Sequence, residues 1–209
     1  MLAQIFFSSY AIADTKLECV RENNEQQLLR QAPGGAARIS QHILEVKHSR
    51  GAKRFTDKPP HEALSGEHWE YCGYSENVKL HLIHHQTEGS FSGSVLFEET
   101  GKVLSAGHTV IVSPDKRKFL AIVQENGKDG EDWTLFEMSG KRLWGGYAGV
   151  VAKISGNHYD SVYAQFENPQ FSADQNLSAN VVCSNQSNKG TVTLTKIGVK
   201  WKWLPDIMC

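Results

Sequence analysis

Apolar and polar positions alternate in short runs over most of the chain after residue 70. The clearest run is VKLHLIHH, residues 78–85, in which Val78, Leu80 and Leu82 occupy every second position. Side chains at alternate positions of a β-strand point to one face, so this pattern predicts a half-buried strand. The other runs are SFSGSVLFEE, VLSAGHTVIVS, KFLAIVQ, DWTLFEM, KRLWGG, YAGVVAKI, DSVYAQF, LSANVVCS, TVTLTKI and VKWKWL. No segment of this region shows the period of an amphipathic helix over a useful length.

Many short strands at such spacing are typical of all-β proteins. We predict a mainly antiparallel all-β domain over residues 71–209, and a sandwich, a barrel and a propeller-like meander are the open alternatives. Residues 14–70 differ, because RENNEQQLLRQAPGGAAR is polar and contains the breaker Pro33-Gly34-Gly35. We expect a less regular N-terminal arm there, with one short hairpin in HILEVKHSRGAKRFTD, turning at Ser49-Arg50-Gly51.

One segment resembles a single blade of a β-propeller. It is AGHTVIVSPDKRKFLAIVQENGKDGEDWTLFEMSGKRLW, and the resemblance is carried by Ser113-Pro114-Asp115, by residues 133–138, by Gly140-Lys141 and by Trp144. A propeller repeats its blade several times, and no convincing second copy follows. The segment therefore predicts a hairpin or meander, in which Pro fixes the backbone of the turn and Asp bonds the backbone that follows.

Residues 1–13 form a candidate export signal. An apolar stretch is followed by Ala11 and Ala13 in the small-x-small pattern of a cleavage site, which predicts cleavage before Asp14, although no Lys or Arg precedes the stretch. The alternative is a buried N-terminal strand. No later run approaches the ~18 apolar residues that a membrane helix requires. We therefore expect a periplasmic or secreted protein without a transmembrane segment.

The four cysteines, Cys19, Cys72, Cys183 and Cys209, contain no CxxC pair, which argues against zinc and thioredoxin-like chemistry. An even number of cysteines in an exported chain indicates disulfides. Three pairings are possible. We favour Cys19 with Cys72 and Cys183 with Cys209, because each pair then ties down one terminus.

Charge and histidine spacing limit the candidate chemistry. The 22 basic and 23 acidic residues are scattered along the chain, which argues against a nucleic-acid partner. His81, His85 and His108 are the candidate metal ligands, but on one strand His81 and His85 would lie about 13 Å apart. With no GxSxG motif and no phosphate-binding glycine loop, we predict no metal, no cofactor and no catalytic residue.

Two further segments suggest binding. In SGNHY, the residues Ser155, Gly156 and Tyr159 match the SGxxY signature, and the segment resembles that of the bacterial periplasmic inhibitors of C-type lysozymes. That resemblance implies a small, secreted, β-barrel-like protein in which a loop with this Ser and Tyr enters the lysozyme cleft. The residues alone equally suggest a turn between strands. Trp201 and Trp203 share one face of a strand in VKWKWLP, where they either stack on sugars or fill a core.

These observations favour a non-catalytic binding module with a protein or glycan partner. The expected binding residues are Ser155, Gly156, Tyr159, Trp201 and Trp203. One alternative is a hydrolase of envelope or extracellular polymers, which requires a nucleophile with a base, or two carboxylates, in one pocket. A structural accessory of the envelope is the third hypothesis.

Overall fold

The computed structural model is 65% strand and 4% helix, so the fold is all-β, as the sequence predicted. It describes residues 15–19, 24–32, 35–61, 65–87, 90–124, 130–152, 161–184, 188–206 and 209. All pairs of neighbouring strands among these residues are antiparallel. Within each sheet the neighbouring strands follow chain order, apart from β1, so each sheet is a meander, and one of the sheets curls into a half-barrel.

The strands form four sheets. The first sheet contains β2 (Ala36–Ser40), β3 (Ile43–His48) and β4 (Gly51–Thr56). The second contains β5 (Glu67–Ser75), β6 (Leu80–Thr87), β7 (Ser90–Phe97) and β8 (Val103–Ala106). The third contains β1 (Thr15–Glu18), β9 (Thr109–Val112), β10 (Lys118–Val123), β11 (Asp132–Glu137) and β12 (Arg142–Tyr147). The fourth contains β13 (Gly149–Ala152), β14 (Ser161–Phe171), β15 (Leu177–Cys183), β16 (Asn188–Ile197) and β17 (Lys200–Leu204).

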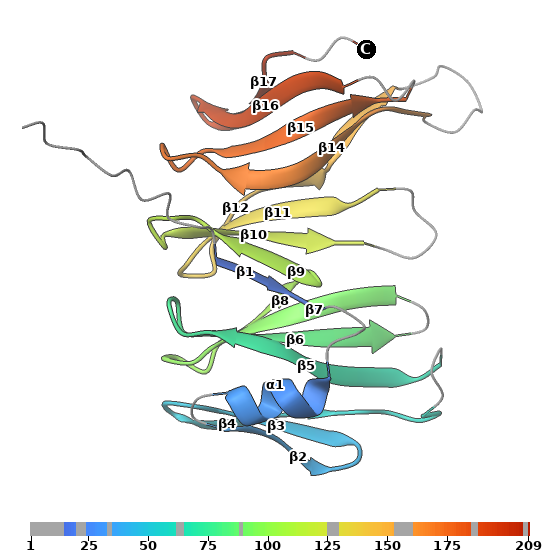
Figure 1. Ribbon diagram of the computed structural model, residues 1–209, viewed down its shortest axis with the longest axis vertical. Coiled ribbons are helices and arrows are strands. Elements are labelled where there is room, and N and C mark those ends of the chain that lie inside the picture. The colour runs from blue at the N-terminus through green and yellow to red at the C-terminus, as the bar shows by residue number, and fades with distance from the viewer. Residues whose placement is uncertain are drawn as a thin grey trace, which may run out of the picture.

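The four sheets lie one above another along the longest axis of the molecule (Figure 1), an arrangement that we call the stack. The segment that resembles a propeller blade forms β9 to β12 of the third sheet. β1 is the one strand that leaves chain order, because it crosses to the third sheet and pairs with β9, placing Leu17 opposite Val110. The hairpin expected at Ser49-Arg50-Gly51 is present as β3 and β4, and β2 adds a third strand to it.

Each pair of neighbouring sheets encloses an apolar layer. Between the first and second sheets the layer includes Leu44, Phe55, Tyr71, Ile83 and Leu96. The layer between the second and third sheets includes Leu82, Val95, Val110, Phe119 and Phe136. Ile111, Leu120, Trp133, Phe166 and Val181 belong to the layer between the third and fourth sheets. Strand alternation produces these layers, since Leu80 and Leu82 face the third sheet while His81 and Ile83 of the same strand face the first.

The outer faces of the two end sheets are largely polar. On the first sheet, Glu45 and Arg54 lie opposite each other and form a salt bridge of 2.8 Å. On the fourth sheet, Thr191 lies opposite Asn180, and Thr193 lies opposite Ser178. These pairs present charged and hydrogen-bonding side chains rather than apolar surface.

A helix and two disulfides complete the fold. α1 (Glu25–Gln31) is capped by Asn24, whose side chain accepts a hydrogen bond from the backbone N–H of Gln26. The cysteines pair as predicted, Cys19 with Cys72 and Cys183 with Cys209. Disulfides of this kind are compatible with an exported protein. Among the described residues, no helix is both long and apolar enough to cross a membrane.

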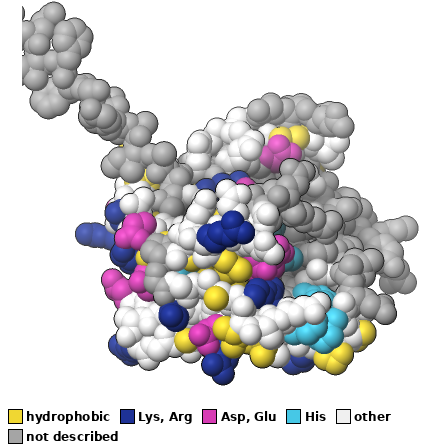
Figure 2. All heavy atoms as spheres, turned by 60° about the horizontal axis from the view of Figure 1, so that its bottom comes forward, with side chains coloured by type: hydrophobic (Ala, Val, Ile, Leu, Met, Phe, Trp, Pro, Cys, Tyr) yellow, Lys and Arg dark blue, Asp and Glu magenta, His cyan; other side chains and the backbone are white. Residues whose placement is uncertain are grey.

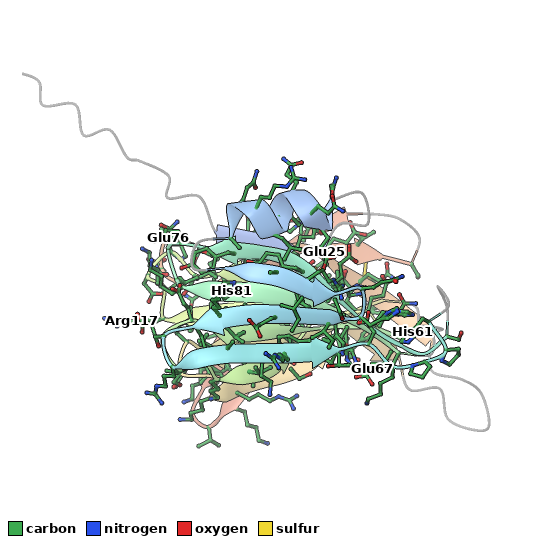
Figure 3. All side chains as sticks on the ribbon, turned by 90° about the horizontal axis from the view of Figure 1, so that it is seen from below. Glu25, His61, Glu67, Glu76, His81 and Arg117 are labelled. Carbon is green, nitrogen blue, oxygen red and sulfur yellow. A yellow bond between two sulfur atoms is a disulfide. The ribbon has the colours of Figure 1, made fainter. Side chains whose placement is uncertain are left out.

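The strands of the four sheets begin and end at two opposite sides of the stack, and these two sides differ. The strand registers and the hydrogen bonds between turns bring seven tight turns to one end, which we call the turn end: residues 49–50, 76–79, 98–102, 113–117, 138–141, 172–176 and 198–199. The opposite end, which we call the loop end, carries the connection from β4 to β5 and the connections around residues 107–108 and 130–131. In Figure 3, Glu76 and Arg117 lie at the turn end, and His61 and Glu67 lie at the loop end.

Candidate functional site

A polar groove of about 640 Å³ opens between the third and fourth sheets, beside β1, and reaches the loop end. Apolar side chains line its depth, among them the buried Ile111, Ile122 and Phe166. Side chains that can form hydrogen bonds line the rest, and the main ones are Glu18, His108, Gln124, Glu131, Gln165 and Gln170. An apolar floor with a few oriented polar groups is the usual form of a binding site for a small molecule or a chain segment.

Neighbouring groups hold in place two carboxylates of the groove, those of Glu18 and Glu131. Glu18 forms a salt bridge of 2.7 Å with Lys16, and the hydroxyl of Thr109 donates to Glu18 at 3.5 Å. The indole N–H of the buried Trp133 donates to Glu131 at 2.8 Å. Both carboxylates are therefore fixed hydrogen-bond acceptors, which is the arrangement expected for recognition.

His108 is the histidine of the groove. Burial lowers its pKa, and the nearby carboxylates of Glu131 and Glu18 only partly oppose that effect. Its backbone carbonyl accepts a hydrogen bond of 2.9 Å from the backbone N–H of Cys19. The imidazole is consequently neutral at pH 7 and can offer one donor and one acceptor.

A β-bulge shapes the wall of the groove on the fourth sheet. The pairing of β14 with β15 shifts register between Glu167 and Gln170, and Asn168 adopts a left-handed backbone with φ of 51°. Pro169 follows and has no N–H to donate to the strand ladder. Bulges turn side chains out of the regular alternation and are frequent next to functional sites, and all four residues of this one line the groove.

Six histidines gather toward the loop end: His42, His61, His68, His84, His85 and His108. Figure 2 shows histidine side chains clustered on that side of the molecule. The rings of His42 and His61 stack with their centroids 3.8 Å apart, and the rings of Trp69 and His85 stack at 3.7 Å. The loop end is therefore the histidine-rich end of the stack.

A serine, a histidine and a glutamate meet on three neighbouring strands of the second sheet. The hydroxyl of Ser92 lies 3.5 Å from Nδ1 of His85, and Nε2 of His85 lies 3.0 Å from a carboxylate oxygen of Glu67. The other carboxylate oxygen of Glu67 lies 2.5 Å from the ammonium group of Lys58, and this hydrogen bond is the main cause that lowers the pKa of Glu67. The hydroxyl of Ser92 also donates a hydrogen bond of 3.2 Å to the backbone carbonyl of His85, so its proton would have to turn from that carbonyl toward Nδ1.

The structure places the predicted binding residues in different situations. Ser155, Gly156 and Tyr159 lie outside the described residues, so the resemblance to lysozyme inhibitors stays a prediction. Trp201 and Trp203 are partly buried against the apolar layer between the third and fourth sheets. The ring of Trp203 lies 4.9 Å from that of Phe166 and also contacts Trp133 and Trp144, so it forms part of the core.

The three candidate metal ligands lie in three separate environments. His81 is buried between the first and second sheets, and its Nδ1 lies 2.9 Å from the hydroxyl of Tyr71. His85 contacts Glu67, and His108 lines the groove. The described part of the chain contains no cluster of three or more potential metal ligands.

Sequence reasoning missed the groove because its lining comes from segments far apart in the chain, from Lys16 to Gln170. One local signal was present. Asn168-Pro169 interrupts the strand pattern that follows residue 161, and a proline inside a strand often marks a bulge. The chain matches no known protein family, no curated protein and no solved structure.

Proposed function

We propose that the protein is a non-catalytic binding module that acts outside the cytosol and holds a glycan chain in the groove. The observation that supports this proposal is the combination of an apolar floor with fixed acceptors, Glu18 and Glu131, and with the carboxamides of Gln124, Gln165 and Gln170. Each carboxamide presents a donor and an acceptor side by side. Neighbouring hydroxyl groups of a sugar have the matching arrangement.

Of the three carboxylates that line the groove, those of Glu18 and Glu131 argue for recognition over catalysis. A glycosidase needs one carboxyl group free to donate a proton and another free to attack or to activate water. In the groove, Glu18 forms a salt bridge with Lys16, and Glu131 accepts a hydrogen bond from the indole N–H of Trp133. Each of these carboxylates therefore already has a partner, so neither is free for the two roles that a glycosidase needs.

The experiment is a glycan array followed by calorimetric titration of the best oligosaccharide. Gln165→Ala and Gln170→Ala should each weaken binding about tenfold, because each removes a hydrogen-bonding side chain from a partly desolvated contact. Gln27→Ala is the matched control, because this glutamine lies exposed on α1, away from the groove. Equal affinities for all four proteins, or no ligand on the array, would reject the proposal.

The arrangement of Ser92, His85 and Glu67 favours a second candidate function, an esterase or amidase. Glu67 accepts from Nε2–H of His85, which leaves the lone pair of Nδ1 facing the hydroxyl of Ser92. In an acyl transfer, the oxygen of Ser92 would attack the carbonyl carbon while Nδ1 takes its proton and passes it to the leaving group. Water would then release the acyl group, with His85 acting as the base.

This candidate is tested with a fluorophosphonate probe and a chromogenic ester. Labelling and turnover that disappear in Ser92→Ala but persist in Ser105→Ala would support it, because Ser105 is an exposed serine on the neighbouring strand β8. An unlabelled wild-type protein would leave the binding module as the sole proposal.

A further inference from the structure

The exposed apolar side chains of the molecule are concentrated at one hairpin tip. Among the described residues, three large aliphatic side chains are exposed: Ile39 at 47%, Ile197 at 52% and Val199 at 90%. Ile197 and Val199 flank Gly198 in the two-residue turn between β16 and β17, at the turn end. Single exposed apolar residues are ordinary, but two on one projecting tip indicate a contact surface.

The hairpin that carries this tip is entirely cationic in its charged residues. Residues 188–204 contain four lysines, Lys189, Lys196, Lys200 and Lys202, and no Asp or Glu, whereas the whole chain has a net charge of −1. Lys196 and Lys200 are exposed; Lys200 directly follows the turn, and Lys196 lies two residues before it. Lys202 is paired with Asp206 at 2.8 Å, and Asp174 lies on the neighbouring turn at the same end.

The hairpin presents the tip rigidly. Gly198 has φ of 60° at the first central position of the turn, the pattern of a type II′ hairpin. Lys200 lies opposite Ile197 in an unbroken ladder that continues to Leu204 opposite Thr193. Trp203 anchors β17 in the apolar layer below the fourth sheet, so the tip does not need to be ordered on contact.

We propose that this tip docks the protein on an anionic lipid membrane. Ile197 and Val199 enter the boundary between head groups and acyl chains, while Lys196 and Lys200 stay at the level of the lipid phosphates. A stable protein interface needs about 800 Å² from each partner, far more than two aliphatic side chains supply. A membrane surface needs only a small apolar wedge with cations around it, because the lipid charges surround each lysine.

Flotation with phosphatidylcholine vesicles, with and without phosphatidylglycerol, tests this docking. The wild-type protein should float with the anionic vesicles and remain behind with the neutral ones. Val199→Asp should reduce binding at least tenfold, because it places a carboxylate where the apolar wedge enters. Lys196→Gln with Lys200→Gln should reduce it about 25-fold, at about fivefold for each lysine near the surface.

Ile39→Asp is the matched control, because it makes the same kind of change on the first sheet, whereas the tip belongs to the fourth sheet at the opposite extreme of the longest axis. All these positions are exposed, so circular dichroism should show unchanged folding. Equal flotation of the wild-type protein and Val199→Asp would overturn the proposal. So would retention on heparin that matches the vesicle affinity and is unaffected by Val199→Asp, since a soluble polyanion uses only the lysines.

Discussion

The turn end and the loop end of the stack use the same strands but connect them differently. At the turn end, short turns bond to one another from sheet to sheet, as when the backbone N–H of Ser49 donates to the carbonyl of Glu98 and the N–H of Asp115 donates to the side chain of Gln175. At the loop end, the connections frame the groove, and six histidines gather there. The turn end therefore joins neighbouring sheets through hydrogen bonds between their turns, and the loop end leaves room for a ligand.

The loop end is instead held by cross-links between side chains. Cys19 follows β1 beside His108, and its disulfide with Cys72 joins the third sheet to the second. Arg38 of the first sheet forms an ion pair with Glu25 of α1 and lies 3.5 Å from Asp57. If this contrast is right, single changes at the loop end should cost more stability than equivalent changes at the turn end.

The largest expected effect is the loss of the Cys19–Cys72 disulfide. The Cys19→Ser, Cys72→Ser variant should lose about 4 kcal/mol of unfolding free energy, because the bond closes a loop with a sequence separation of 53 residues. Urea denaturation measures the loss, and hydrogen exchange should show it first around β1 and the groove. The Cys183–Cys209 bond closes a separation of 26 residues, so its removal should cost about 3.5 kcal/mol.

The next largest loss of stability is expected from Gly107→Ala, which we compare with Gly198→Ala. A Cβ on Gly107, near the loop end, would lie 1.4 Å from the backbone carbonyl oxygen of Ile122, so an alanine must push strands of the second and third sheets apart. Gly107→Ala should cost about 3 kcal/mol. Gly198→Ala at the turn end has open space around it and only the positive φ to strain it, so it should cost about 1 kcal/mol. Equal thermal unfolding of the two variants would contradict the contrast between the ends.

The two arginines of the first sheet compare its inner and outer faces. Arg38 donates to Glu25 through two nitrogen atoms and also contacts the backbone carbonyl of Trp69, with 24% of its side chain exposed. Arg38→Ala should cost about 3 kcal/mol, because the half-buried Glu25 and the buried Asp57 lose their cation. Arg54 pairs with Glu45 on the outer face, so Arg54→Ala should cost less than about 1 kcal/mol. Chemical denaturation that ranks Arg54→Ala above Arg38→Ala would refute this view of the first sheet.

The sequence was sufficient for the local part of this fold. Alternation predicted the strand content, Ser113-Pro114-Asp115 marked a real turn, and the cysteine pairing was correct. It was insufficient where contacts join distant residues. β1 pairs with a strand more than 90 residues later, and no pattern within four residues specifies its partner. α1 was missed although Asn24 stands at its cap, because the polar segment around it has no apolar stripe long enough to reveal a helix.

The site shows the same limit. Histidine spacing predicted that His81 and His85, on one strand, lie too far apart to bind a metal alone. It did not reveal that Ser92 faces His85 across a turn, or that Glu67 approaches from the strand on the other side. Those contacts depend on the register of three strands, which turn lengths and buried faces determine jointly.

The smallest effect is an acid destabilisation centred on His81. This side chain is 1% exposed, and burial lowers its pKa from 6.5 to about 4. Burial also raises the pKa of Tyr71, so the tyrosine keeps its proton, and its hydroxyl lies 2.9 Å from Nδ1 of His81. Between pH 6.5 and 4, His81 therefore binds a proton in the unfolded chain but not in the folded chain. The free energy of unfolding must then fall as the pH falls through this window.

The expected loss between pH 7 and pH 5 is about 2 kcal/mol for His81 alone. His81→Gln should remove most of that slope while costing stability at pH 7, because its amide replaces the ring imperfectly beside Tyr71. His108→Gln should remove a further part, since burial lowers the pKa of His108 in the same direction at the loop end. Urea denaturation at both pH values separates the two contributions. If His108→Gln changes the slope more than His81→Gln, then His108 at the loop end is shielded from water more strongly than His81. That result would contradict the proposed difference between the two ends.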